Sequence, residues 1–254
     1  MDQPTLGGQA PQPEAVGTQP SRGDLFEVMS TMRTMRRLKA DPIPRELIER
    51  LIQAASWAPS GGNSQTATFV VVDDRTQIAR IAPLWRRAER FYVTAQGDAC
   101  PPTMSQQQWQ RTLDASRYLA EHFEEVPALI LVCSDVPELL NRWVTNAGAV
   151  AHAFGNLGVR QGVTTGRNFV QFARRSIAAS VYPAVENLLL AARCCGLAAS
   201  LTTWHVLFEQ ELKAILGIPK HVSTFAAVPI GYPKGRFGPV NRAPVAQFLR
   251  WNHW

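Results

Sequence analysis

The run of six uninterrupted apolar residues from Ala128 to Cys133 constrains the fold more than any other feature of the chain. A short apolar run without polar alternation is typical of a strand that is buried on both faces of a sheet. Such a strand needs cover on either side, so we expect a sheet that lies between layers of helices. The run is far shorter than the roughly 18–20 residues that cross a bilayer, and no membrane-spanning protein is expected.

Helix and strand signals alternate along the rest of the chain. Helices are expected after a capping pattern at 21–24, over 47–55, around 78–81, and over 113–123, 176–195 and 209–216. Strands are expected at 69–72, 128–133, 198–202 and 225–230. Pro183 would lie in the first turn of its helix or kink it, and Gly217 would end the last helix. This order predicts one α+β domain over 24–254.

Two stretches lack the signals of a packed core. Residues 1–23 contain four prolines and four glycines with few large apolar side chains, so we expect a flexible N-terminal arm. Residues 141–175 contain five glycines. Long loops in compact domains are usually functional, which favours a mobile lid or a surface excursion over 141–175.

The charge balance bears on the possible partners. The 254 residues include 26 basic and 20 acidic side chains, giving a formal net charge of +6, and a basic chain raises the possibility of a nucleic-acid partner. The basic residues are scattered in small groups, however, and no zinc finger or RNP-like aromatic string accompanies them. A solvated surface with a local anion site is favoured, and no nucleic-acid partner is expected.

The cysteine and histidine patterns argue against several kinds of site. The four cysteines form no CxxC pair, and no basic and apolar leader opens the chain, so a reducing cytoplasm is the expected compartment. The five histidines are dispersed, and the HExxH, GxSxG, GxGxxG and P-loop patterns do not occur. Neither a metal centre nor a hydrolytic site is expected.

Two segments are polar where packing does not require it. The first runs from Arg33 to Arg37, where three guanidiniums and the Thr34 hydroxyl could clamp a phosphate. Alternatively, it is a basic helix end that complements the helix dipole, and taken alone this is the better interpretation. The second runs from Ala58 to Gln65, where two glycines allow close approach of a ligand to the backbone. A helix-terminating turn would explain Pro59 and Gly61 there, but not the polar side chains that follow.

Together, in that order and about 25 residues apart, these segments resemble the FMN-dependent nitroreductase family, which opens with an Arg-Ser-x-Arg-like element followed by Ala-Pro-Ser-x-x-Asn-x-Gln. The resemblance continues at 196–203, 216–219, 228–233 and 242–252, and covers 24–254 apart from 141–175. It implies a nitroreductase-like α+β fold with a central, mostly antiparallel sheet flanked by helices. It also implies a domain-entwined homodimer with flavin sites at the interface.

The resemblance further implies which residues hold FMN. The N-terminal arginine element and one C-terminal arginine would bind the phosphate, the 60–65 loop would come from the partner subunit, and the backbone of 201–204 would contact the flavin ring. The residues expected at the cofactor are Arg33, Thr34, Arg36, Arg37, Ser60, Gly61, Asn63, Gln65, Leu201, Thr202, Thr203, Trp204 and Arg242.

The implied activity is an oxidoreductase in which NADPH or NADH reduces bound FMN, and the flavin then reduces a nitroaromatic or quinone-like acceptor in a ping-pong cycle. Side chains cannot carry hydride, so a cofactor must. As a hypothesis, the insert folds over the flavin, its arginines bind the 2′-phosphate of NADPH and its phenylalanines line the substrate cavity. An exposed loop with solvated charges is an equal alternative. The residues concerned are Phe154, Arg160, Arg167, Phe169, Arg174 and Arg175.

Other functions remain open at this point. A flavin-consuming or ene-type reductase would share the scaffold and differ in its pocket. A non-catalytic FMN-binding protein would bind flavin without being reduced by NAD(P)H. A nucleic-acid-binding module ranks well below these, and it would bind with a steep salt dependence and without a flavin.

Overall fold

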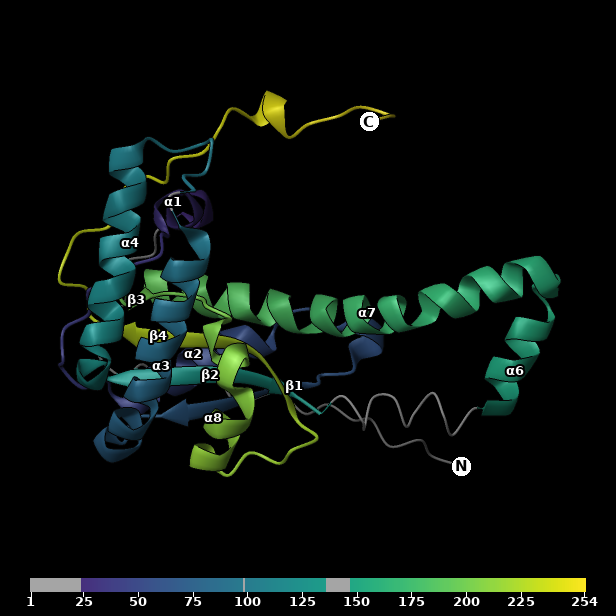
Figure 1. The fold of residues 1–254 in the computed structure, drawn as a ribbon, viewed down its shortest axis with the longest axis horizontal. Helices are drawn as coiled ribbons and strands as arrows, with labels where there is room; N and C mark the ends of the chain where they lie inside the picture. The colour runs from purple at the N-terminus through teal and green to yellow at the C-terminus, as the bar shows by residue number, and fades with distance from the viewer. Residues whose placement is uncertain (1–23, 98, 136–146) are drawn as a thin grey trace, which may run out of the picture.

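The computed structural model describes residues 24–97, 99–135 and 147–254 (Figure 1). The helices are α1 (Leu25–Thr31), α2 (Arg45–Ser56), α3 (Arg75–Gln96), α4 (Gln106–Glu121), α6 (Ala147–Gly155), α7 (Gly158–Cys194) and α8 (Glu209–Leu216). The strands are β1 (Ala67–Val72), β2 (Ala128–Ser134), β3 (Ala198–Ala199) and β4 (Ser223–Gly231). Short 3-10 turns are η1 (Gly61–Asn63), η2 (Phe123–Glu125), η3 (Trp204–Phe208) and η4 (Val245–Gln247). The expected N-terminal arm and residues 141–146 of the insert lie outside the described residues.

The four strands form one sheet in the order β1-β2-β4-β3. Each neighbouring pair is antiparallel, with Val70 opposite Leu131 between β1 and β2, and Ile130 opposite Val228 between β2 and β4. The expected antiparallel sheet is therefore confirmed. A register shift between Val132 and Cys133 interrupts the pairing of β2 with β4.

Strand β2 is buried along its whole length, as its apolar run predicts. Successive side chains of a strand point to opposite faces, and here both faces are covered. Ile130 and Val132 belong to the cluster formed with α2 and α7. Leu129 and Leu131 belong to a second cluster, which includes residues of α3, α4 and α8. The sheet thus lies between two helical layers.

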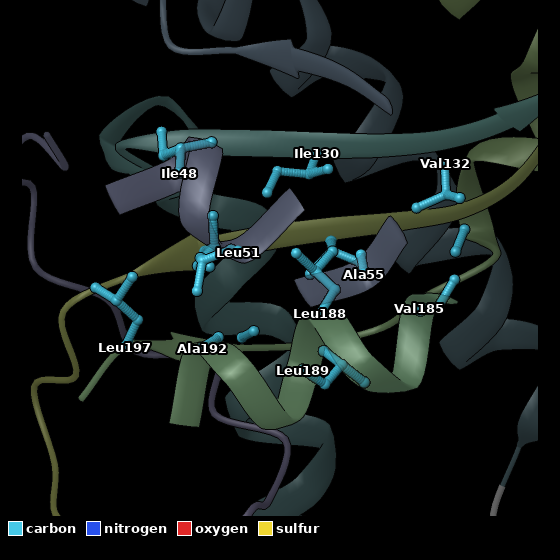
Figure 2. Close-up of a cluster of buried hydrophobic side chains, with 14 of the residues drawn as sticks. Ile48, Leu51, Ala55, Ile130, Val132, Val185, Leu188, Leu189, Ala192 and Leu197 are labelled. Carbon is cyan, nitrogen blue, oxygen red and sulfur yellow. The ribbon is translucent and has the colours of Figure 1, made fainter. Parts of the chain in front are cut away.

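Helices α2 and α7 close the first face of the sheet (Figure 2). Leu51 and Ala55 of α2 meet Val185 and Leu188 of α7 at helical spacing, and all four are at most 1% exposed. Full burial of such side chains stabilises the fold by roughly 1.5–3 kcal/mol each. This face therefore contributes a closed aliphatic core.

The helices on the second face are longer than their sequence signals indicate. The start of α4 is fixed at Gln106 by a capping box between Ser105 and Gln108, seven residues before the expected start at Leu113. The start of α3 is capped by Asp74, whose carboxylate accepts from the Gln77 N–H at 2.8 Å. Helix α3 then continues through Pro83 to Gln96. These longer helices form one wall of the pocket described below.

The described part of the insert, 147–175, is helical and is not the long loop that its glycines favoured, because α6 and the first half of α7 occupy it. Its role as a lid stays a prediction. Glycine costs about 1 kcal/mol relative to alanine in a helix, but extending an existing helix adds a hydrogen bond for each residue fixed. The projecting half therefore continues the packed half of α7 as one helix. Figure 1 shows α7 running beyond the sheet to α6. Pro183 consequently lies inside the helix and not in its first turn.

Candidate functional site

The arginine element at 33–37 follows α1 and has no regular secondary structure, so its interpretation as a helix end is wrong. Backbone hydrogen bonds attach it to the sheet edge. The Met35 N–H donates to the Ala199 carbonyl at 3.3 Å, and the Lys234 N–H donates to the Arg37 carbonyl at 2.9 Å. The bond from Met35 fixes Arg36 beside the end of β3.

A pocket of about 900 Å³ lies where the second helical layer meets this edge. Its volume is at the upper end of the range for small-molecule sites, roughly 300–1,000 Å³. Helices α3 and α4, the segment 200–207 and the arginine element all contribute side chains. The lining residues are Arg36, Trp85, Phe91, Tyr92, Ala95, Gln96, Ala99, Trp109, Thr112, Leu113, Ser116, Leu119, Ser200, Leu201, Thr202, Thr203, Trp204, Val206 and Leu207.

Arg36 supplies the cationic group of this lining. Its side chain is half-buried, and no described residue forms an ion pair or a hydrogen bond with its guanidinium. Burial lowers the pKa of Arg36 below its usual value, while neighbouring Tyr92 acts in the opposite direction. Arginine still stays protonated in proteins. An unpaired, half-buried cation lowers the stability of the fold, because its lost hydration is not replaced. The pocket is therefore suited to a ligand that brings an anionic or acceptor group to Arg36.

The segment after β3 also lines the pocket. The expected strand 198–202 is reduced to Ala198–Ala199, followed by one isolated bridge at Thr202. Thr202 and Ala227 exchange backbone hydrogen bonds of 3.0 and 2.9 Å. The Thr202 hydroxyl also accepts from the Trp204 N–H at 3.1 Å. The backbone at 202–204 is therefore fixed where a planar ligand would contact it.

Aromatic side chains dominate the helical wall of the pocket, and the sequence analysis missed them. Tyr92 of α3 lies 5.1 Å from Trp204, measured between ring centroids. The Tyr92 hydroxyl accepts a hydrogen bond of 2.9 Å from Gln96 Nε2. Trp85, Phe91 and Trp109 are the other aromatic residues of this wall. Aromatic residues at helical spacing are equally typical of an ordinary core, so the sequence held no signal that separated them.

The other residues expected at the phosphate lie outside this lining. Arg33 and Thr34 are exposed, and a side chain at Gly238 would come within 3.4 Å of Arg33 Nη1, so the C-terminal section passes beside that guanidinium. The guanidinium of Arg37 lies 4.6 Å from the centre of the Tyr118 ring. Arg242 Nη1 donates to the Asn241 carbonyl. Their role at the cofactor stays a prediction.

The loop at 60–65 lies against α7 and not in the pocket of its own chain. The Gly61 N–H donates to the Ser180 hydroxyl at 3.0 Å, and the Gln65 N–H donates to the Ser60 hydroxyl at 3.0 Å. Asn63 and Gln65 have φ angles of 52° and 49°. Left-handed backbone costs an ordinary residue roughly 1–2 kcal/mol, and strain of this kind is often stored at functional sites.

The insert residues expected at NADPH also lie away from the pocket. Arg160, Arg167, Arg174 and Arg175 are exposed on the projecting half of α7. Phe154 belongs to α6, near the glycines of the facing α7 turn, and the side chain of Phe169 is not described. Their binding roles stay predictions. In this chain α3 and α4, rather than the insert, provide the aromatic lining.

Among the described residues, no group of three His, Cys, Asp or Glu side chains could hold a metal ion. No described helix combines the length and apolar character needed to cross a bilayer.

Comparison with known proteins identifies the family and the fold of the chain. The model of the Nitroreductase family matches residues 30–232. The chain belongs to this family.

Among curated relatives, iodotyrosine deiodinase 1 of Rattus norvegicus is 26% identical over 213 residues, which is 83% of this chain and 62% of that protein. The chain thus spans less than two thirds of that relative. An NADH dehydrogenase of Thermus thermophilus is 27% identical, over 86% of this chain and 91% of that protein.

Solved structures of this family share the fold. An oxidised iodotyrosine deiodinase bound to FMN and 3-iodo-L-tyrosine superimposes with a TM-score of 0.62 at 21% identity, covering 91% of this chain and 100% of that one. A putative NADH dehydrogenase/NAD(P)H nitroreductase from Parabacteroides distasonis gives a TM-score of 0.58 at 22% identity, covering 91% and 98%. The nitroreductase-like α+β fold is therefore confirmed.

Proposed function

We propose that this protein is an FMN-dependent NAD(P)H oxidoreductase that reduces nitroaromatic or quinone-like acceptors. The observation that carries the proposal is the pocket of about 900 Å³, in which unpaired Arg36 faces a lining rich in aromatic rings. Flat, electron-poor molecules stack favourably on such rings. A pocket of this volume is large enough for a flavin ring with a second planar molecule stacked on it.

The donor set fits FMN. A guanidinium stabilises the negative charge that a reduced flavin carries at its N1–C2=O edge, and Arg36 has no competing partner among the described residues. Bound FMN would accept hydride from a nicotinamide and pass reducing equivalents to the acceptor. The chain would hold the ring with Arg36 and the backbone at 202–204, and exclude water with Trp85, Tyr92 and Trp109.

The remaining part of the site would come from a second copy of the chain. Ser60, Asn63 and Gln65 lie outside the pocket of their own chain, in a loop whose left-handed backbone is held by hydrogen bonds. In a homodimer, this loop would reach the flavin of the partner. Two half-sites in an isologous interface give two equivalent flavin pockets.

A visible absorption spectrum of the purified protein, followed by anaerobic addition of NADPH and then NADH, tests the proposal. We expect a flavin spectrum that bleaches with at least one nicotinamide and returns when a quinone is added. A flavin spectrum that neither nicotinamide bleaches would indicate a non-catalytic FMN-binding protein. Failure to bind FMN at all would refute the assignment.

Reductive removal of iodide from an iodinated phenol is a second candidate, because several relatives are iodotyrosine deiodinases. An amino-acid substrate carries an ammonium group, which needs a carboxylate or several carbonyls nearby. No carboxylate is present among the described lining residues, and this favours the first candidate. Release of iodide from 3-iodo-L-tyrosine by the dithionite-reduced protein would favour the second.

A further inference from the structure

Reduction of a quinone requires a proton as well as hydride. Two electrons and one hydrogen arrive together as hydride from the reduced flavin, and the second hydrogen of the hydroquinone arrives as a proton on the other oxygen. A side chain that delivers this proton must lie in the pocket and carry a hydrogen that no other protein group accepts.

Tyr92 meets these conditions. It lines the pocket beside Trp204, at a distance of 5.1 Å between ring centroids. Its hydroxyl accepts from Gln96 Nε2 at 2.9 Å, and no described group accepts a hydrogen bond from it. Because a phenol has one hydrogen and two lone pairs, this arrangement leaves the Tyr92 hydrogen directed away from Gln96 and available to a ligand.

Tyr92 shares the pocket with the guanidinium of Arg36. Tyr92 lies close enough to Arg36 to act on it electrostatically, and Arg36 is unpaired among the described residues. The attraction between a cation and a nearby anion is stronger in a partly desolvated site than in bulk water. The other hydroxyls of the lining are aliphatic alcohols of serine and threonine, which are far weaker acids than a phenol.

We propose that Tyr92 donates the proton that completes reduction of the electron acceptor. Its O–H bond breaks, a new O–H bond forms on the acceptor oxygen, and the electron pair stays on the phenol oxygen, in the pocket that Arg36 also lines. Water then returns a proton to Tyr92. Gln96 is a positioning residue, since its amide orients the Tyr92 hydroxyl. This inference rests on the proposed function.

The test compares Tyr92→Phe with Tyr118→Phe as a matched control. Tyr118 also has a hydrogen-bonded hydroxyl, which accepts from Lys234 Nζ at 2.8 Å, but it does not line the pocket. Each FMN-loaded protein is reduced anaerobically with dithionite and mixed with 1,4-benzoquinone or with ferricyanide. Ferricyanide takes one electron at a time and no proton, so it reports electron transfer alone.

We expect Tyr92→Phe to slow oxidation by the quinone roughly 10²-fold, the lower end of the range for general acids, and to leave oxidation by ferricyanide within about twofold. Tyr118→Phe is expected to change neither rate. The quinone rate of Tyr92→Phe should rise as pH falls, because solvent protons replace the phenol. The proposal would be overturned if Tyr92→Phe and the wild type were oxidised by the quinone at the same rate. It would also be overturned if Tyr92→Phe lost the same factor in rate with the quinone and with ferricyanide.

Two further measurements do not depend on turnover of the Tyr92 variant. Gln96→Leu, which keeps the phenol, should slow the quinone step by about three- to tenfold, the value of one hydrogen bond. Binding of 4-nitrophenol to oxidised protein, followed by its visible absorption, should weaken by a similar factor in Tyr92→Phe and not in Tyr118→Phe. Unchanged binding would count against a Tyr92 hydrogen bond. A wild-type protein that binds no FMN would instead refute the proposed function.

Discussion

The two faces of the sheet are packed differently. On the α2–α7 face, Leu51, Val185 and Leu188 are at most 1% exposed and belong to one aliphatic cluster. On the α3–α4 face, aromatic side chains border a pocket of about 900 Å³. The indole nitrogens of Trp85 and Trp109 are buried there without a hydrogen-bond partner within the described chain.

We infer from this difference that the α2–α7 face mainly stabilises the fold and that the α3–α4 face mainly binds a ligand. An aliphatic core gains its stability from close packing and has no polar group to satisfy. The other face forgoes some packing and contains an unpaired guanidinium, a combination that lowers stability but suits a ligand. Residues of the first face should therefore affect unfolding, and residues of the pocket should affect ligand binding.

The largest expected effect is a loss of stability on the α2–α7 face. Leu188→Ala should lower the free energy of unfolding by about 2–5 kcal/mol, because it removes a fully buried side chain and leaves a cavity. Urea denaturation measures it. Val163→Ala is the control, since Val163 is 53% exposed on the projecting half of α7, and it should change stability by less than about 0.5 kcal/mol. Similar losses in both variants would contradict the comparison.

A second effect concerns a buried imidazole on the α3–α8 side. His205 is 4% exposed among Ile81, Leu84 and Leu212, and burial lowers its pKa to about 4. Between pH 6.5 and about 4, the unfolded chain binds a proton on this residue that the folded chain does not. Stability therefore falls as pH falls through this window, by up to about 3 kcal/mol at 1.36 kcal/mol per pKa unit.

His205→Leu should remove that part of the acid destabilisation, as measured by urea unfolding at pH 7 and at pH 4. Glu209 contributes in the same direction and stays in both proteins. Burial opposes its ionisation, but hydrogen bonds from Thr224 and Lys213 leave its pKa below the usual value. An identical pH dependence in wild type and variant would show that His205 does not titrate in this way.

The third effect belongs to the pocket. Arg36→Met should weaken FMN binding by roughly 10- to 100-fold, equivalent to the 1.5–3 kcal/mol of a charged hydrogen bond, without lowering the free energy of unfolding of the apoprotein. Quenching of flavin fluorescence measures the affinity. Arg86→Met is the matched control, because Arg86 pairs with Glu124 at 3.1 Å on the surface. A loss of stability in Arg36→Met would show that this cation supports the fold instead.

Much of the fold could be predicted from local pattern. The apolar run at 128–133 predicted β2 and its burial, and α8 runs from Glu209 to Leu216 with Gly217 left-handed at its end, as expected. These features depend on residues close together in the sequence. A loop was expected over 141–175, but its described residues, 147–175, are helical, because the glycines there do not prevent α7 from continuing beyond its packed half.

The site could be predicted only in part. Arg36 and 201–204 were named from the resemblance and do line the pocket. Tyr92, Trp85 and Trp109 were not named, because their helices carry the same aromatic periodicity that a closed core would show.

The sequence alone determined the buried strand, the family resemblance and most of the order of elements, since each depends on short runs of residues, but it missed α6 and the part of α7 over 158–175. The tertiary structure decided which aromatic side chains are packed in the core and which line the pocket. Whether Tyr92 fills a core or faces a cavity depends on how far α3 and α4 stand from 200–207, and that separation is set by contacts across the whole second face of the sheet.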